Sequence, residues 1–188
     1  MLVLTLNTMG EPLQWSSWQD AVTYHAKGLV SWSIGENKTT YYGGKNKAGT
    51  RSYITVPSII AVKSNNHIKR RIPVLSNRNL FGRDLNFCAY CGKIHLESKL
   101  TRDHIVPVSR GGHNTWLNCI TACKKCNNEK DNKTLEEWGT QLKFLPYVPD
   151  RYEVMLLANR NVLADQMEFL LNHIPKNSRV HKENAFYL

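Results

Sequence analysis

The alternation of apolar and polar positions predicts a sheet near the N-terminus. Three runs are typical of strands: residues 2–7, 29–34 and 51–62. A stretch rich in Gly and Lys, YYGGKNKAGT, joins the second run to the third and predicts a turn. Pro57 lies within the third run. Proline cannot donate a ladder hydrogen bond, so this position indicates a sheet edge or a bulge.

Helical periodicity and capping signals mark further segments. We expect a helix from the Ser16–Ser17 cap to about Lys27 with Gly28 as its stop, a short one over 77–83, and another from the Thr134–Glu137 capping box to Gly139. Apolar residues then recur at 152, 156, 163, 167, 170 and 174. This spacing predicts one long amphipathic helix, serving as a packing element or as the surface of a homodimer.

Composition adds that the chain is globular. Its 188 residues are 41% hydrophobic and suffice for one domain or two small ones. No apolar run reaches the roughly 18 residues of a membrane span. The start, MLVLTLNTMGEP, lacks the basic region and the cleavage site of a signal peptide and is interpreted as a strand. A cytoplasmic location without membrane association is therefore expected.

The net charge of +10 is concentrated in one segment. Residues 37–83 contain no Asp or Glu but hold ten basic residues: Lys38, Lys45, Lys47, Arg51, Lys63, Lys69, Arg70, Arg71, Arg78 and Arg83. Concentrated positive charge favours a polyanion, since binding releases the counterions of nucleic acid; a solvated basic face is the alternative. The contacts expected for nucleic acid are Lys69, Arg70, Arg71, Arg78, Arg83, Arg110 and Lys130. The aromatic side chains in this segment could stack on bases, although core packing is their commoner role: Tyr41, Tyr42, Tyr53 and Phe81.

Four of the five cysteines form two pairs, Cys88-x-x-Cys91 and Cys123-x-x-Cys126. In a cytoplasmic chain this pattern predicts a tetrathiolate zinc site rather than disulfides. A site closed by four ligands has no open coordination position and is structural. Cys119 is interpreted as a small buried apolar residue.

The 31 residues between the two pairs are more than the spacing found in a plain zinc ribbon, so the additional residues must form further structure. We predict strands over 100–106 and 116–121, a loop with a Gly pair between them, and a helix from Cys123 through CNNEK. Asp103 and His104 are adjacent on the first strand, so their side chains are expected on opposite faces. Chemistry by this pair needs something that brings them to one site.

At this point the sequence resembles the HNH endonucleases, whose fold is called ββα-metal. The matching residues are CAYC, DHIVPVSRGG, the Asn of TWLNCITAC, and CKKCNNEK. The string VLTLNTMGEPLQWSSWQDAV also resembles the start of a widespread bacterial and phage group of stand-alone HNH proteins. The resemblance implies an α+β chain with a ββα-metal module stapled by a four-cysteine zinc site. It also implies that the protein is located in the cytoplasm of a bacterium or of a phage-infected host cell.

The resemblance assigns roles to four residues. His104 would be the general base that takes a proton from water, and Asn118 would fix the loop that orients the imidazole. Asp103 and Asn127 would bind a catalytic divalent ion. Asn127 stands where many members have a second histidine, which makes this an H-N-N variant. Two oxygen ligands suit Mg²⁺ or Mn²⁺.

Three regions are expected from these patterns: a basic α+β arm for DNA over 1–80, the nuclease module over 81–139, and a helical extension over 140–188. The function expected is metal-dependent hydrolysis of DNA phosphodiester bonds, with double-stranded DNA as the partner. By the resemblance, the products carry 5′-phosphate and 3′-hydroxyl ends. Two alternatives remain open: a non-catalytic, zinc-stabilised nucleic-acid-binding protein, and a nuclease directed at RNA.

Overall fold

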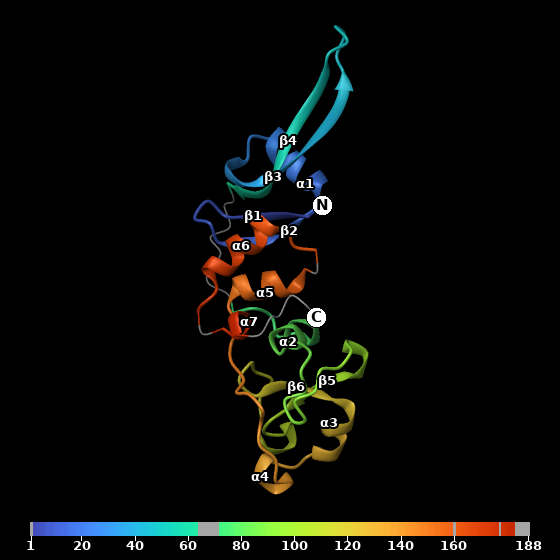
Figure 1. Ribbon diagram of the computed structural model, residues 1–188, viewed down its shortest axis with the longest axis vertical. Coiled ribbons are helices and arrows are strands. Elements are labelled where there is room, and N and C mark those ends of the chain that lie inside the picture. The colour runs from blue at the N-terminus through green and yellow to red at the C-terminus, as the bar shows by residue number, and fades with distance from the viewer. Residues whose placement is uncertain (1, 64–71, 160, 177, 183–188) are drawn as a thin grey trace. The chain divides into compact units, whose positions relative to one another are not determined.

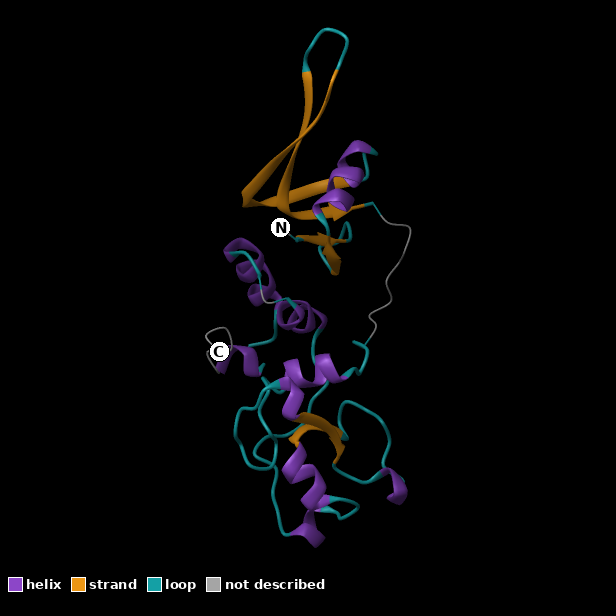
Figure 2. Ribbon diagram, turned by 90° about the vertical axis from the view of Figure 1, so that its right-hand side faces the viewer, coloured by secondary structure: helices purple, strands orange, loops and turns teal. Residues whose placement is uncertain are grey.

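The computed structural model describes residues 2–63, 72–159, 161–176 and 178–182, which fold into two compact units (Figures 1 and 2). Unit 1 comprises residues 1–71 and 159–174, and unit 2 comprises residues 72–158 and 175–188. This division differs from the three consecutive regions expected from the sequence. The C-terminal segment is not one extension, because part of it packs with the N-terminal sheet.

Unit 1 is built on a four-stranded sheet. Its order is β2 (Pro12–Ser16), β1 (Val3–Leu6), β4 (Arg51–Val62) and β3 (Val30–Lys45). β1 runs parallel to β4, and the other two pairs are antiparallel. The three predicted strands are present, whereas β2 was not predicted. β3 also continues 11 residues past the predicted end at 34, because its outer half is held by its ladder with β4 rather than by burial.

Pro57 lies in β4, an inner strand of this sheet. It pairs with Lys38, at the end of a register shift in β3 between Ile34 and Lys38. β1 does not extend to Pro57, so this position lies at a local edge of β4 and beside a register shift in β3, in agreement with the expected edge or bulge. β1 pairs with β4 only through residues 59–61, so residues 51–57 of β4 are paired with β3 alone.

The core of unit 1 lies between this sheet and α1 (Trp18–Ala26). Ser17 caps the helix as predicted: its hydroxyl accepts from the N–H of Asp20, and the Asp20 carboxylate accepts from the N–H of Ser17. The buried side chains are Val3, Ala21, Val56, Ile60 and Val62.

α6 (Ala164–His173) also belongs to unit 1 and lies against β3 and β4. The amide of the buried Gln166 donates to the carbonyls of Leu2 (3.0 Å) and Ser58 (2.8 Å). α5 (Arg151–Ala158) belongs to unit 2. The predicted single helix over 152–174 is therefore wrong. The chain leaves α5 through a turn in which the N–H of Asn161 donates to the side-chain oxygen of Asn159 (3.0 Å).

The apolar stripe of the predicted helix is nevertheless used within the chain. Leu156 packs in unit 2, and Leu170 and Ile174 are buried in unit 1. This agrees with the packing element that the sequence offered as one alternative. The homodimer offered as the other stays a prediction.

Unit 2 contains the predicted hairpin followed by a helix. Its elements are α2 (Asn77–Arg83), η1 (Glu97–Lys99), β5 (Leu100–His104), η2 (Val108–Arg110), β6 (Cys119–Cys123), α3 (Lys124–Lys130), α4 (Leu135–Trp138), α5 and α7 (Arg179–Lys182). α4 has the predicted capping box and ends at Gly139 in the left-handed conformation. β6 begins three residues later than predicted, because residues 115–118 form a turn. The α+β class holds.

The β5–β6 hairpin separates two apolar clusters. Ile120 and Ala122 pack on one side with Cys88, Ala89 and other residues around the cysteines. Cys119 packs on the other side with side chains that include Leu80, Phe81, Leu100 and Trp116. The hairpin is thus buried on both faces. Among the described residues, no helix has the length and apolar character that a bilayer crossing requires.

Candidate functional site

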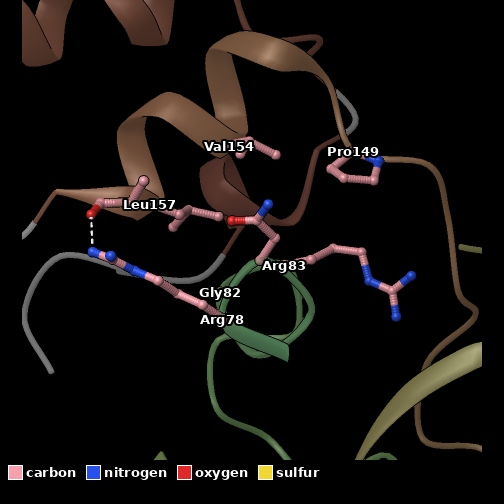
Figure 3. A pocket seen from close by; sticks show the side chains of 8 residues that line it. Arg78, Gly82, Arg83, Pro149, Val154 and Leu157 are labelled. Carbon is pink, nitrogen blue, oxygen red and sulfur yellow. Dashed lines mark hydrogen bonds between the residues drawn. The ribbon is translucent and has the colours of Figure 1, made fainter. Parts of the chain in front are cut away.

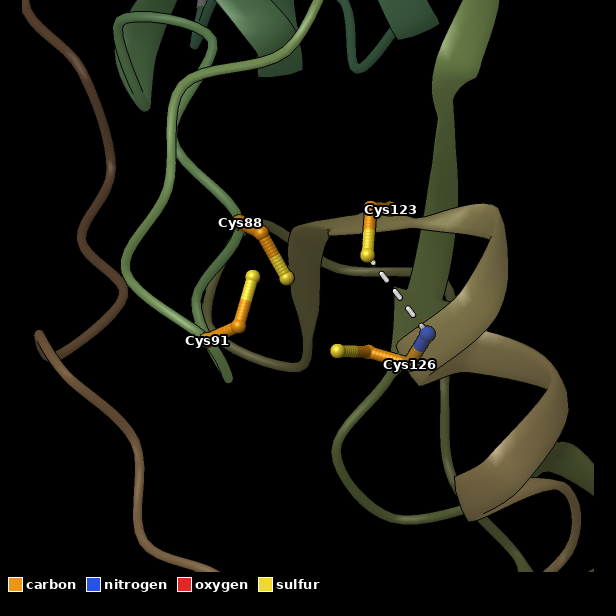
Figure 4. Close-up of side chains that lie close together, drawn as sticks. All are labelled: Cys88, Cys91, Cys123 and Cys126. Carbon is orange, nitrogen blue, oxygen red and sulfur yellow. Dashed lines mark hydrogen bonds between the residues drawn. The ribbon is translucent and has the colours of Figure 1, made fainter.

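The four paired cysteines converge in unit 2 (Figure 4). Cys88 and Cys91 lie on a tight loop in which the N–H of Gly92 donates to the carbonyl of Cys88 (2.9 Å). Gly92 has a φ of 70°, a conformation that favours glycine. Cys123 ends β6 and caps α3, and Cys126 lies in the first turn of that helix. One ligand atom from each cysteine lies within 4.8 Å of all the others.

This cluster fits a metal ion. A tetrahedral ion with Zn–S bonds of about 2.3 Å separates the sulfur atoms by about 3.8 Å, which is within the observed limit. The four cysteines are free thiols. Burial raises the pKa of Cys91 and of Cys126, and the neighbouring sulfur atoms add to it. Burial acts the same way on Cys88, but backbone N–H groups, that of Cys91 foremost, outweigh it and lower the pKa. Four thiolates this close together repel one another, so a bound cation is needed to stabilise their charged form.

Asp103 is buried beside this cluster, on β5. Its carboxylate accepts hydrogen bonds from the Tyr90 hydroxyl and from the N–H of His104 (2.8 Å), and the Lys130 ammonium lies 3.2 Å away. Burial, with the hydrogen bond to Asp103, raises the pKa of Tyr90 far above its usual range, so the hydroxyl remains a donor. Asp103 is therefore fixed from three directions.

His104 follows on the same strand. The pairing of β5 with β6 is regular through His104 and Cys119, so Asp103 and His104 leave the strand on opposite faces, as expected. The Nε2 atom of His104 is buried and has no hydrogen-bond partner among the described residues. A buried imidazole nitrogen without a partner costs free energy, and a bound polar group from outside the chain would offset it.

Asn118 fixes the loop that follows β5. Its amide oxygen accepts from the N–H of Val106 (2.9 Å), and its amide nitrogen donates to the carbonyls of Val106 (3.1 Å) and His113 (2.9 Å). Gly112 passes so close that an added Cβ would lie 1.8 Å from the Val106 oxygen. The Gly pair is thus needed for close approach as well as for the turn.

Asn127 extends from α3 toward β5. Its side-chain nitrogen donates to the hydroxyl of Thr101 (2.9 Å). Thr101 and Asp103 are two residues apart on the strand and share a face. The amide of Asn127 and the carboxylate of Asp103 therefore lie on the same side of the hairpin, where both are oxygen donors of the type that hard divalent ions prefer.

Residues 88–143 match the model of a protein family described as HNH endonuclease. This range contains the four cysteines, Asp103, His104, Asn118 and Asn127. The segment belongs to the HNH endonuclease family.

Two relatives match this HNH domain. The CRISPR-associated endonuclease Cas9 of Corynebacterium diphtheriae is 40% identical over 53 residues, which is 28% of this chain and 5% of that protein. YoqL of the SPbeta prophage of Bacillus subtilis, which carries the name of an HNH endonuclease, is 38% identical over 64 residues. That alignment covers 28% of this chain and 26% of YoqL. The matches thus span a small part of each relative.

Two basic residues of the HNH domain and its flank are not where the sequence suggested. We expected Arg83 and Lys130 to contact nucleic acid, but both are fully buried. Lys130 bonds the carbonyl of His104 (2.8 Å) and neutralises Asp103. Arg83 pairs with Asp84 and donates to the three carbonyls of Trp116, Cys119 and Tyr147. Both residues hold the protein interior together, which corrects the expectation.

The other expected contacts are exposed or lie outside the description. Arg78 is exposed and donates to the carbonyl of Ala158 (2.5 Å), on the opposite side of α2 from Arg83 (Figure 3). Arg110 is about half exposed and pairs with Glu137 (2.7 Å). The three residues Lys69, Arg70 and Arg71 fall in 64–71, which the structure does not describe.

Sequence reasoning missed the partners of Asp103 and Asn127 within the HNH domain. Tyr90 stands between two cysteines, where the pattern drew attention to the sulfur atoms alone. Lys130 has the sequence context of a surface lysine, and its burial becomes evident only from the packing of α3 against the hairpin. Thr101 could have been noticed, because alternation puts it on the face of Asp103.

Proposed function

We propose that the chain is a metal-dependent endonuclease that hydrolyses phosphodiester bonds of double-stranded DNA. The observation that carries the proposal is the placement of an acid–amide pair, Asp103 and Asn127, on one side of the β5–β6 hairpin, whose first strand ends at His104. This hairpin lies in the segment that matches HNH endonucleases. The names of its two relatives support nuclease chemistry in the same segment.

Two ions are part of the proposal. The four thiolates would hold a structural Zn²⁺, because four sulfur ligands close the coordination sphere. Asp103 and Asn127 would hold Mg²⁺ or Mn²⁺ through oxygen atoms. When bound, this second ion supplies positive charge that stabilises the negative charge developing on the phosphate oxygens.

His104 would act as the general base. Hydrolysis requires that an attacking water lose a proton as its oxygen bonds to phosphorus, and an imidazole titrates close enough to neutrality to accept it. The chain holds the backbone of His104 in place from both ends. Its N–H bonds the Asp103 carboxylate, and its carbonyl accepts from Lys130. Asn118 would position the loop that follows.

The test is incubation of the purified protein with supercoiled plasmid, linear duplex, single-stranded DNA and RNA of one sequence, with and without Mg²⁺ or Mn²⁺. Duplex cleavage with 5′-phosphate and 3′-hydroxyl ends is expected only with a divalent ion. Preference for the RNA would favour the RNA-directed alternative. Tight binding without any cleavage would favour the non-catalytic binder.

The matched variants are His104→Ala and His113→Ala. His113 is exposed in the adjoining loop and contributes only its backbone carbonyl to Asn118. Loss of the base should slow cleavage by about 10² or more, and the control should cut at the parental rate. Equal rates for both variants would remove His104 from the mechanism.

A further inference from the structure

The β3–β4 hairpin of unit 1 has an exposed outer half. β1 reaches β4 only at residues 59–61, so the two strands continue beyond Pro57 as a two-stranded ribbon (Figure 1). From Lys38 to Lys45 the ribbon is about 24 Å long at about 3.4 Å per residue. At its tip, the side-chain oxygen of Asn46 accepts from the N–H groups of Ala48 (3.0 Å) and Thr50 (2.9 Å). The ribbon is ordered by its own hydrogen bonds.

One face of the ribbon is braced by unit 1. Tyr41 pairs with Ile54 and Thr39 with Val56, and these residues lie toward α1. The ring of Tyr41 stacks on Trp18 with centroids 4.6 Å apart and planes 5° apart. This aromatic contact fixes the direction in which the ribbon leaves the sheet.

The opposite face is open to solvent. Alternation and register place six side chains on it: Lys38, Thr40, Tyr42, Arg51, Tyr53 and Thr55. We call these six residues the open face. Tyr42 and Tyr53 are 62% and 66% exposed, and the Arg51 guanidinium lies 5.2 Å from the centre of the Tyr42 ring. Thr40 and Thr55 bond each other across the strands (3.0 Å).

The chemistry of the open face fits a polyanion. It combines cations, hydroxyls and two aromatic rings, and the chain has no carboxylate side chain from residue 37 to residue 83. Lys45 and Lys47 at the tip add positive charge. Apart from Pro57, the buried partner of Lys38, the face carries no aliphatic side chain larger than threonine, which disfavours insertion into a lipid surface.

The shape selects duplex DNA among polyanions. Paired strands lie about 4.8 Å apart, and the major groove of B-DNA, about 12 Å wide, admits a two-stranded ribbon. The deep, narrow major groove of duplex RNA does not. We propose that the open face enters the major groove of duplex DNA, with Arg51 and Lys38 directed at phosphates and the tyrosine and threonine hydroxyls at base edges. This inference deepens the proposed function and rests on its choice of DNA as the substrate.

The test measures binding rather than cleavage. All proteins carry His104→Ala and are titrated into a labelled DNA duplex without added Mg²⁺ or Mn²⁺. Arg51→Ala/Tyr53→Ala alters the open face, and Lys27→Ala removes one positive charge from the exposed end of α1 as a matched control. The first variant should weaken duplex binding about 10-fold or more and reduce the dependence on salt by about one phosphate contact. The control should bind within about 2-fold of the parent.

Footprinting locates the groove. Dimethyl sulfate methylates guanine N7, which faces the major groove. The parent should protect N7 positions, and Arg51→Ala/Tyr53→Ala should lose this protection while keeping the parental thermal unfolding curve. Equal duplex affinity in the two variants would overturn the proposal. So would a loss confined to single-stranded DNA, or protection confined to adenine N3 in the minor groove.

These outcomes are separate from those that test the nuclease. A protein without the His104→Ala change that binds through the open face and does not cut would refute the proposed function and keep this inference. Cleavage by that protein, combined with duplex binding that Arg51→Ala/Tyr53→Ala leaves unchanged, would do the reverse.

Discussion

Replacing Arg83 by methionine should destabilise unit 2 severely. The guanidinium is buried and makes two bonds to the Asp84 carboxylate (2.8 and 3.0 Å). It also donates to three backbone carbonyls, at 2.7, 3.0 and 2.9 Å. Methionine fills much of the same volume but leaves the buried Asp84 carboxylate with the N–H of Thr121 (2.9 Å) and the more distant guanidinium of Arg179 (3.9 Å).

Removing one partner of a buried ion pair costs about 3–5 kcal/mol. Each carbonyl that loses its hydrogen bond would cost about 1 kcal/mol or more. This cost is not added, because the range for breaking a buried ion pair already includes part of it. Unit 2 has about 100 residues, for which 1 kcal/mol lowers the midpoint of thermal unfolding by at least about 4 °C. The lower bound of 3 kcal/mol therefore predicts a midpoint lower by about 12 °C.

The assay is calorimetric unfolding of the wild type, Arg83→Met, Arg83→Met/Asp84→Asn and Arg78→Met. Asparagine removes the stranded charge and keeps an oxygen that accepts from Thr121, so the double variant should be more stable than Arg83→Met. Arg78→Met loses one exposed hydrogen bond and should cost no more than about 1 kcal/mol. An Arg83→Met protein as stable as Arg78→Met, but weakened in DNA binding, would refute this reasoning and restore Arg83 as a surface contact.

Three further outcomes are expected. Cys123→Ser should lose the bound metal and unfold unit 2, because the binding free energy of a structural zinc site, about 10–16 kcal/mol, is comparable with the whole stability of a domain. Metal analysis and circular dichroism measure the two effects. The control variant Cys119→Ala should retain the metal. Asn118→Ala should keep its fold and DNA affinity but cut on the order of 10²-fold more slowly in single-turnover assays, and an unchanged rate would contradict its positioning role. Burial raises the pKa of Glu153, so the folded state binds its proton more readily than the unfolded state. The stability of the wild type relative to Glu153→Gln should rise as pH falls from 7.5 to 5, and a gap independent of pH would refute this.

The cysteine cluster and the hairpin could be predicted because their signals are local. A C-x-x-C pair brings two sulfur atoms together within one turn of chain, and Gly112 marks a close approach of backbone. The caps at Ser17 and Thr134 are local for the same reason, since side chain and backbone partner lie three residues apart. These features need no knowledge of the rest of the fold.

The misjudged residues depend on distant partners. Arg83 is held by carbonyls 33 to 64 residues away, and nothing near it in the sequence distinguishes it from a surface arginine. The apolar periodicity from 152 to 174 continues across the gap between α5 and α6. Periodicity indicates which side chains are buried, but it does not show whether they belong to one helix or to two. Asn159 and Asn161, weak helix formers, were the available warning.

The return of residues 159–174 to the first unit makes both units discontinuous along the chain. Residues 175–188 then go back to the second unit, where the guanidinium of Arg179 lies 4.0 Å from the centre of the Phe144 ring. The first unit therefore cannot finish assembling before residue 174 has left the ribosome, and the second unit must wait for the segment that follows. For the same reason, a simple truncation cannot excise the second unit intact, and any recombination that transfers this unit must also transfer its C-terminal residues.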